Sequence, residues 1–487
     1  MATGQYEKSA TARGGTGPAG GRRARLVLAL VCACQFMVIL DSSIVNVALP
    51  SVRADLGFTD TGVAWVVNGY LLAFAGLLLL GGRAADLAGA RRVLTAGLLV
   101  FSVSSLVGGL APTPGVLVAA RVAQGVGAAL TAPATLAVIH THFTEPGARA
   151  RAFGAWASSG GVGGLAGAIV GGAFTTGLSW RWVFLVNVPV GALLVAVALT
   201  RLSAARTARR EPVDVLGALT GTLGLAALVF GVTGIADGGR GSGAVLGPVL
   251  TGAVLLGVFL AVESRASHPM VPLRLFRSRA IATGNAMLLL FGGIAIALWY
   301  FTALFLQNVL GFSALQAGLG QTPAAVGFMV VARYASGRLA SAGVRALVLA
   351  GAACFVAGFL WLSAAGPGSG YATGVLGPTL LVSAGIGLTF PALMAASTAG
   401  APEEYAGTVG GLATTAHQVG GSVGLAVLAT AAGARAADAA PGTPAAAAVA
   451  AGYQLVFLLA AGLAVAVALI SLLVPGRPVR RKPAETP

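Results

Sequence analysis

Apolar stretches long enough to cross a bilayer recur along the whole chain, separated by short polar breaks. A helix needs about 20 apolar residues to cross the hydrocarbon core, where every backbone polar group must be bonded within the protein. Hydrophobic residues make up 57% of the 487 residues and charged residues only 9%, which excludes a soluble globular domain. The sequence therefore predicts an all-α polytopic membrane protein.

The apolar stretches predict 14 transmembrane helices. Longer polar breaks at 201–213 and 263–280 flank the seventh and eighth, so we expect six helices, an inserted pair and six more. Two six-helix halves around a central cavity are typical of transporters built on internal repeats. The Ala-rich stretch 433–451 contains charges and prolines and is predicted to be an external loop. The predicted helices span 26–49, 62–82, 93–111, 115–139, 152–174, 182–200, 214–236, 244–262, 281–306, 316–334, 345–364, 372–395, 406–432 and 452–474.

This pattern divides the chain into five predicted units. Residues 1–25 are rich in Gly, Ala and Arg, which predicts a disordered cytoplasmic tail before a retained first helix. An N-terminal six-helix bundle (26–200), a linker with two inserted helices (201–280), a C-terminal six-helix bundle (281–474) and a second cytoplasmic tail (475–487) follow.

Basic residues favour one side of the predicted membrane. Of the 30 lysines and arginines, only Arg53, Arg181, Arg240 and Arg435 fall in predicted external segments. Cytoplasmic loops are enriched in Lys and Arg, so the pattern predicts a plasma-membrane protein with both termini cytoplasmic. The net charge of +16 follows from this topology, and we expect no nucleic-acid partner.

One acidic residue, Asp41, lies deep in an apolar stretch. A carboxylate there costs about 2.5–3.5 kcal/mol and usually marks an ion or proton pathway. At ~1.5 Å per residue, Asp41 lies about 12 Å and Arg121 about 9 Å from the outer ends of their helices. A pair at this depth would reduce the cost of burying either charge, with Gln124 on the same face as Arg121. The pair could simply orient two helices, but we favour proton coupling, because an acid beside a cavity can change protonation as the pair opens.

Polar side chains elsewhere in the apolar stretches are predicted to line a substrate cavity. His417 could be a second protonatable site, although a hydrogen-bonding or cavity-lining role is favoured. Because Asp41 faces a neutralising arginine, the predicted lining suits neutral, zwitterionic or monovalent molecules better than divalent cations. The predicted cavity residues are Asn46, Asn68, Tyr70, Gln124, Asn285, Gln307, His417 and Gln418.

Four motifs in order resemble one family. They are Leu40–Pro50 in the first helix, Gly82–Arg92 after the second, Trp180–Gly191 at the start of the sixth, and Leu306–Ser313 after the ninth. They are similar to the fourteen-helix drug:proton antiporters of the major facilitator superfamily, over roughly residues 26–474. The resemblance implies a major facilitator fold and proton-coupled export of small hydrophobic compounds such as antibiotics by alternating access, without a cofactor.

Glycines in the fifth predicted helix predict close packing. Gly160, Gly164, Gly167 and Gly171 are spaced by four, three and four residues, which places a groove on one face. Within the resemblance, Gly163, Gly167, Gly171 and Gly172 match the motif associated with antiporters, with Ala168 in place of its usual proline. In the same way, the segment Arg121–Gly125 resembles the fourth-helix motif tied to proton coupling.

The short loop after the second predicted helix contains Gly82, Asp86, Gly89 and Arg91. Asp86 is expected either to be part of an ordinary charged turn or to act as a latch, capping a helix or pairing with an arginine in one conformational state. Leu87 stands where the family often has arginine, which removes one contact from such a latch.

Other function classes receive less support. A same-fold transporter of a nutrient, lipid or metabolite is the main alternative, and a membrane-embedded sensor or enzyme is less favoured. The chain lacks intramembrane carboxylate pairs, metal-ligand spacing and a Walker-type loop, so we expect no enzyme activity, metal or ATP site. Cys32, Cys34 and Cys354 show no disulfide or metal spacing. The expected partners are a small-molecule substrate, protons and the bilayer, and a monomer is compatible with the sequence.

Overall fold

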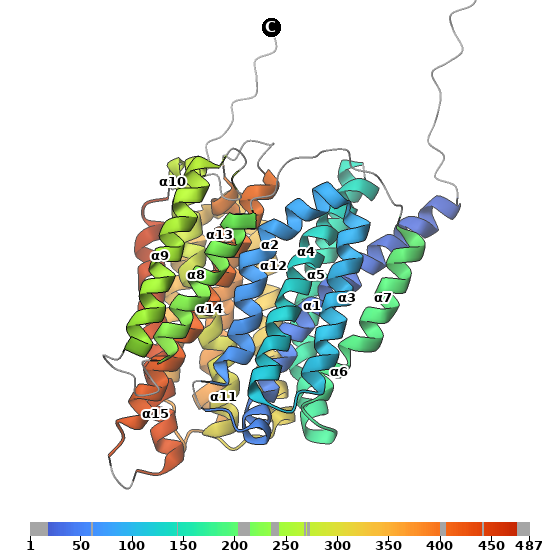
Figure 1. Ribbon diagram of the computed structural model, residues 1–487. Helices are drawn as coiled ribbons and strands as arrows, with labels where there is room; N and C mark the ends of the chain where they lie inside the picture. The colour runs from blue at the N-terminus through green and yellow to red at the C-terminus, as the bar shows by residue number, and fades with distance from the viewer. Residues whose placement is uncertain are drawn as a thin grey trace, which may run out of the picture.

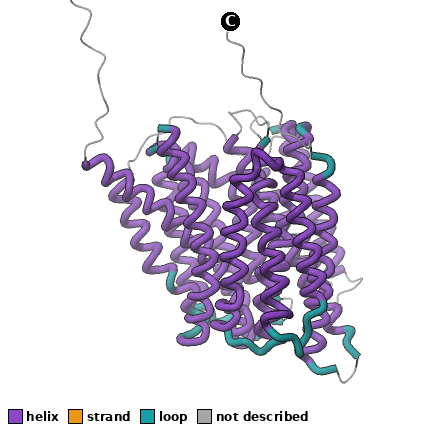
Figure 2. Tube along the Cα trace, turned by 180° about the vertical axis from the view of Figure 1, so that it is seen from behind, coloured by secondary structure: helices purple, strands orange, loops and turns teal. Residues whose placement is uncertain are grey.

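The computed structural model describes residues 18–59, 62–143, 145–202, 215–234, 243–266, 269, 273–399, 406–440 and 443–474. All regular secondary structure in these ranges is helical, as the apolar pattern predicted. The long helices run side by side between two edges of the molecule (Figures 1 and 2). The predicted tails 1–17 and 475–487 and the linker 203–214 lie outside the described residues.

The N-terminal half packs its helices in a bundle around α1 and α4. α1 contacts α5, and α4 contacts α2 and α3. Thr113 caps α4 by accepting a hydrogen bond from the Val116 amide, and Pro114 occupies the first helical turn, where its missing N–H costs nothing. The helices are α1 (Pro18–Leu56), α2 (Ala64–Ala88), α3 (Ala90–Gly109), α4 (Pro114–His142), α5 (Pro146–Gly177), α6 (Trp182–Leu185) and α7 (Asn187–Arg201).

The inserted pair, α8 (Val215–Gly234) and α9 (Gly243–Arg265), lies against the junction of the two halves. α8 contacts both α2 and α14 (Ala406–Ala437), and Leu72, Val229 and Ala426 from these three helices form one buried cluster. The Thr430 hydroxyl donates a hydrogen bond of 3.3 Å to the Val232 carbonyl. α8 is therefore fastened to both halves.

The C-terminal half contains the longest helical element, α12 (Ala314–Ser363). It reverses direction at Gly343, whose φ of 79° favours glycine, so it contains two membrane-length segments. Ser313 and Gln316 form a capping box at its start. The other elements are η1 (Leu273–Arg277), α10 (Arg279–Ile296), η2 (Ala297–Phe301), α11 (Thr302–Asn308), η3 (Tyr371–Leu376), α13 (Gly377–Thr398), α14 and α15 (Ala445–Ser471).

Twelve helices of the described chain are long and apolar enough to cross a membrane, and shorter apolar stretches occupy Ala64–Leu78 and Leu219–Val232. The described chain thus has twelve to fourteen apolar helices, in approximate agreement with the 14 predicted. One prediction was wrong: much of 433–451 is helical, because α14 continues to Ala437 and α15 begins at Ala445. Alanine has the highest helix propensity, and it outweighed the local charges and prolines used to predict a loop.

Arginines distinguish the two edges of the molecule. α1 begins and α15 ends at the same edge (Figure 1). We call this the basic edge, because the helix ends there carry Arg83, Arg91, Arg92, Arg201, Arg265, Arg279 and Arg345. The opposite edge has Arg53, Arg181 and Arg435 among the described residues, and the predicted external Arg240 lies outside them.

Candidate functional site

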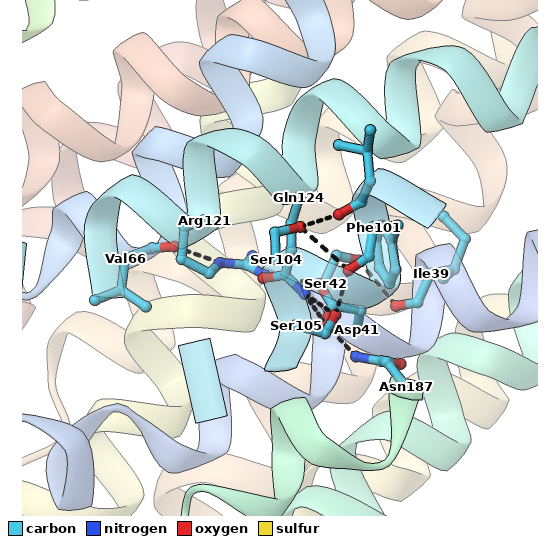
Figure 3. Close-up of polar contacts among 11 residues, drawn as sticks. Ile39, Asp41, Ser42, Val66, Phe101, Ser104, Ser105, Arg121, Gln124 and Asn187 are labelled. Atoms are coloured by element: carbon cyan, nitrogen blue, oxygen red, sulfur yellow. Dashed lines mark hydrogen bonds and ion pairs between the residues drawn. The ribbon is translucent and has the colours of Figure 1, made fainter. Parts of the chain in front are cut away.

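Asp41 and Arg121 form the ion pair expected from their depth. An Arg121 Nη1 atom donates to Asp41 Oδ2 at 2.6 Å, and the two side chains are 1% and 0% exposed (Figure 3). Asp41 comes from the middle of α1 and Arg121 from the outer part of α4. Both charges are therefore fully removed from solvent, which demands that each be paired and hydrogen-bonded.

Two amide side chains complete the surroundings of the carboxylate. Asp41 Oδ1 accepts a hydrogen bond from Asn187 Nδ2 at 2.8 Å and one from Gln124 Nε2 at 3.1 Å. Gln124 also accepts from Arg121 Nη1 at 2.9 Å and donates to Ser105 Oγ at 2.6 Å. All of these residues are buried in the N-terminal half (Figure 3). The site is therefore a closed polar network within one half.

The guanidinium of Arg121 is held from a third direction by α2. Its Nε atom donates to the Val66 carbonyl at 2.8 Å, and its Cζ lies 4.4 Å from the ring centre of Tyr70. The ring of Phe184 lies 5.8 Å away on another side. Aromatic faces stabilise a desolvated cation, so Arg121 is fixed in place whether or not Asp41 is charged.

Asn187 and Ser105 were not identified from the sequence. Asn187 belongs to the quoted Trp180–Gly191 motif, and its isolation between Val186 and Val188 is a signal that could have revealed it. Ser105 offers no such signal, because serines at several positions of α3 bond only to carbonyls of their own helix.

Glycines of α5 bring its backbone against α1 beside Asp41. A Cβ atom at Gly163 would lie 2.7 Å from the Phe36 carbonyl, one at Gly167 2.8 Å from the Leu40 carbonyl, and one at Gly171 2.7 Å from the Ile44 carbonyl. Real Cβ atoms do not approach so closely, so only glycine permits this packing. The predicted groove is confirmed in part: Gly167 and Gly171 belong to it and Gly163 takes the place of Gly164, whereas Gly160 and Gly164 face only side chains of α1.

A second face of α5 meets the C-terminal half. A Cβ atom at Gly172 would lie 2.6 Å from Leu315 Cα, and Gly318 packs directly on the Ala168 carbonyl. Ala168, Val47 and Ala314 form a small buried cluster across the two halves. The alanine that replaces the motif's usual proline therefore lies within a tight contact between the halves.

The predicted cavity residues do not converge on one site. Tyr70 and Gln124 belong to the Asp41 network. Asn68 accepts a hydrogen bond from Ser422 across α2 and α14, and Gln307 donates to the Val47 carbonyl across α11 and α1. The remaining members lie elsewhere. Asn46 has a buried Oδ1 without a partner, and Asn285 donates to Ile281 of its own helix. The ring of His417 packs against the stacked rings of Phe291 and Phe390, and Gln418 follows it on α14.

The segment predicted to be a loop after the second helix is mostly helical, because α2 continues to Ala88 and only Gly89 separates it from α3. Gly89 joins α2 and α3 with a φ of 90°, a conformation that favours glycine. Arg91 donates to the Leu199 carbonyl at 2.7 Å, which ties α3 to the end of α7. A Cβ atom at Gly82 would lie 3.7 Å from Pro133 Cβ, an ordinary contact. The side chain of Asp86 lies outside the described residues, so its latch role stays a prediction.

A cleft of about 870 Å³ opens at the opposite edge. One side is formed by the end of α1 and the segment that follows it, with Phe58 and Val63, and the other side by η2, α11, α14 and α15. None of the predicted cavity residues lines it. In the described part of the chain, no group of three His, Cys, Asp or Glu residues could hold a metal ion.

The described residues form two helical halves that contact each other along several helix pairs, and one half contains a buried ion pair. This is the architecture of a multi-pass membrane transporter built from two helical bundles. The chain belongs to the Major Facilitator Superfamily, whose sequence profile matches residues 31–425. Solved structures support the fold: a nucleoside transporter aligns with a TM-score of 0.67 at 13% identity, over 92% of this chain and 99% of that one. A bacterial homologue of the lysosomal transporter Spinster aligns with a TM-score of 0.66 at 16% identity, over 94% and 97%.

Curated relatives are more similar in sequence. The chain is 44% identical to the cephamycin export protein CmcT of Amycolatopsis lactamdurans, over 84% of this chain and 85% of that protein. It is 38% identical to the puromycin resistance protein pur8 of Streptomyces alboniger, over 83% and 80%. It is 34% identical to a tetracenomycin C resistance and export protein of Streptomyces glaucescens, over 84% and 77%. The family expected from the motifs is thus confirmed.

Proposed function

We propose that this protein exports antibiotics or similar small hydrophobic compounds across the plasma membrane in exchange for protons, by alternating access. The names of the similar relatives, which include export and resistance proteins for cephamycin, puromycin and tetracenomycin C, support the cargo class. The observation that carries the coupling is the buried Asp41 carboxylate, paired with Arg121 and accepting two further hydrogen bonds.

Protonation of Asp41 Oδ2 would break the ion pair, because the neutral carboxylic acid no longer attracts the guanidinium. Arg121 would keep its bonds to the Val66 carbonyl and Gln124 and its packing on Tyr70. The change therefore falls mainly on α1, which loses its strongest link to α4.

α1 connects this site to the junction between the halves. Val47 lies six residues after Asp41, about 9 Å along the helix, and its carbonyl accepts a hydrogen bond from Gln307 of α11. Movement of α1 after protonation would alter this contact and the Val47–Ala168–Ala314 cluster. Proton binding in one half would thereby bias the opening of the contact between halves.

The direct test is drug-driven proton release from proteoliposomes that contain Asp41→Asn. The amide keeps the shape but cannot exchange a proton, so release should be abolished while the protein stays folded. Asp55→Asn is the matched control, because Asp55 lies on the same helix but bonds to Trp180 and Arg181 at the opposite edge. Arg121→Ala is unsuitable alone, since it leaves Asp41 buried and unpaired. Undiminished release by Asp41→Asn would place coupling elsewhere.

The orientation is a separate part of the proposal. We infer from the arginine-rich basic edge that this edge and both termini are cytoplasmic. In a variant without native cysteines, a cysteine at Asp438 should react with a membrane-impermeant thiol reagent in intact cells, while one at Ser9 should not. Labelling at Ser9 from outside would reverse the topology. Growth-inhibition tests across antibiotic classes, with and without expression, would identify the cargo.

A further inference from the structure

Protonation of Asp41 creates a hydrogen-bond donor in a buried site where the carboxylate only accepts. Its Oδ2 atom accepts from Arg121, and its Oδ1 atom accepts from Asn187 and Gln124. The protonated carboxyl carries an O–H group, which needs an acceptor when it is buried. Arg121 cannot receive this hydrogen, because a guanidinium has donors and no acceptor. The protonated form therefore needs an oxygen atom from another residue.

The oxygen atoms of the polar network beside the ion pair are already engaged. Gln124 Oε1 accepts a hydrogen bond from Arg121 Nη1 at 2.9 Å. Ser105 Oγ accepts from Gln124 at 2.6 Å and donates to the Phe101 carbonyl at 2.7 Å. A new hydrogen bond from Asp41 to either oxygen would compete with these contacts.

Tyr70 of α2 has a side-chain oxygen that is not in use. The residue is 1% exposed, and its hydroxyl has no hydrogen-bond partner among the described residues. A buried hydroxyl without a partner is destabilising and calls for an explanation. The ring of Tyr70 lies 4.4 Å from Arg121 Cζ, and the same guanidinium bonds to Asp41 at 2.6 Å. The unused hydroxyl therefore belongs to a residue that is one side chain away from the carboxylate, and the charges of Asp41 and Arg121 both act on it.

We propose that Tyr70 is a positioning residue of the coupling site, and that its hydroxyl oxygen accepts a hydrogen bond from the protonated Asp41 carboxyl. The role rests on the proposed protonation of Asp41. The incoming proton stays bonded to Asp41 Oδ2, and Tyr70 keeps its own hydroxyl proton. α1 then exchanges its ion pair with α4 for a hydrogen bond to α2. Because the hydroxyl gains a partner only in the protonated state, it favours the conformation that follows proton binding.

Infrared difference spectroscopy of the full chain in phosphatidylcholine nanodiscs tests the proposal. Acidification should produce a carboxylic-acid C=O band that is absent from Asp41→Asn, which assigns the band to Asp41. In Tyr70→Phe this band should move to higher frequency, because the acid loses its hydrogen-bond acceptor while the ring against Arg121 is kept. A purely structural role of the ring would leave the band in place. Drug-driven proton release from proteoliposomes should also fall about five-fold in Tyr70→Phe, as expected for one hydrogen bond between neutral groups.

Thr302→Val is the matched control, because Thr302 of α11 is 2% exposed and its hydroxyl also has no partner among the described residues. It should leave both the Asp41 band and proton release unchanged. Neither Tyr70→Phe nor Thr302→Val should lower the thermal unfolding temperature, since each removes an unsatisfied buried group.

An unshifted Asp41 band in Tyr70→Phe would overturn the proposal and assign the acceptor to another group, such as Asn187 Oδ1. A lower unfolding temperature of Tyr70→Phe would also overturn it, by showing that the hydroxyl already has a partner. Absence of any Asp41 band in the unmodified protein would instead refute protonation of Asp41 itself. The failure of the proposed coupling is therefore distinguished from the failure of the role of Tyr70.

Discussion

The Asp41 carboxylate and the Arg121 guanidinium are buried together in the membrane, but their other partners differ. Asp41 accepts from three side chains on α4 and α7, whereas Arg121 is also fixed by a backbone carbonyl and an aromatic ring of α2. The arginine therefore keeps hydrogen-bonded and aromatic partners after Asp41 is neutralised, which lowers the cost of leaving its charge without a counter-ion. This asymmetry is what a reversible protonation step at Asp41 requires.

Asn187→Leu should impair proton-coupled transport. The substitution keeps the side-chain size but removes one of the hydrogen bonds that hold the Asp41 carboxylate in the network. Drug-driven proton release should fall by about ten-fold, as expected for the loss of a hydrogen bond to a charged group. The measurement is the rate of release from proteoliposomes.

Ser105→Ala provides the control for this prediction. Ser105 bonds to Gln124 rather than to Asp41, so the release rate should fall less. Equal losses for the two variants would mean that Asn187 acts through general packing.

Asp41, Arg121 and Gln124 could be predicted from sequence, whereas Asn187 and Ser105 could not. Asp41 and Arg121 stand out because charges are rare and costly in apolar helices. Asn187 and Ser105 are ordinary residues for a membrane helix, and only the crossing of α1, α3, α4 and α7 brings them into the network. The predicted cavity residues lie at separate places for the same reason. The depth of a polar residue in the membrane can be estimated from the sequence, but its hydrogen-bond partner cannot.

At the scale of helices, α5 connects the ion-pair site with the contact between the halves. One of its faces packs backbone to backbone on α1 through Gly163, Gly167 and Gly171, and another packs on α12 at Gly172. Apolar length predicted the existence of nearly every helix, including the two segments of α12 on either side of Gly343, but not the break between α6 and α7. That break depends on local contacts rather than on hydrophobicity.

Gly167→Ala should force α1 away from α5. The added methyl group would lie 2.7 Å from Ser43 Cβ and 2.8 Å from the Leu40 carbonyl, so the backbone must move. We expect a loss of about 1–3 kcal/mol in stability and a lower transport rate. Thermal unfolding in detergent and efflux assays measure both.

Gly164→Ala is the matched control on the same helix. Its new methyl group would meet only Ile39 Cγ2 at 3.8 Å, an ordinary contact. Because both changes gain the same helix propensity, similar stability for the two variants would contradict the packing argument.

At the scale of the whole molecule, the halves are joined near the opposite edge on one side and parted by the cleft on another. The joined side includes the hydrogen bond of 3.2 Å from the Leu315 amide to Thr176 Oγ1 and the packing of Gly172 on Ala314. Alternating access at this edge requires these contacts to separate. The separation of the two cleft walls does not by itself break the contacts between α5 and α12.

A disulfide between Thr176→Cys and Leu315→Cys should therefore arrest transport. The two residues belong to α5 and α12, and their hydrogen bond places them within bridging range. In a background without Cys32, Cys34 and Cys354, oxidation should abolish efflux and a reductant should restore it. The control is Gly108→Cys with Ala120→Cys, a pair within the N-terminal half, because a Cβ atom at Gly108 would lie 3.6 Å from Ala120 Cβ. That bridge should leave transport intact, because it joins parts that move together. Efflux that continues through an oxidised Thr176–Leu315 bridge would show that the halves do not separate at this contact.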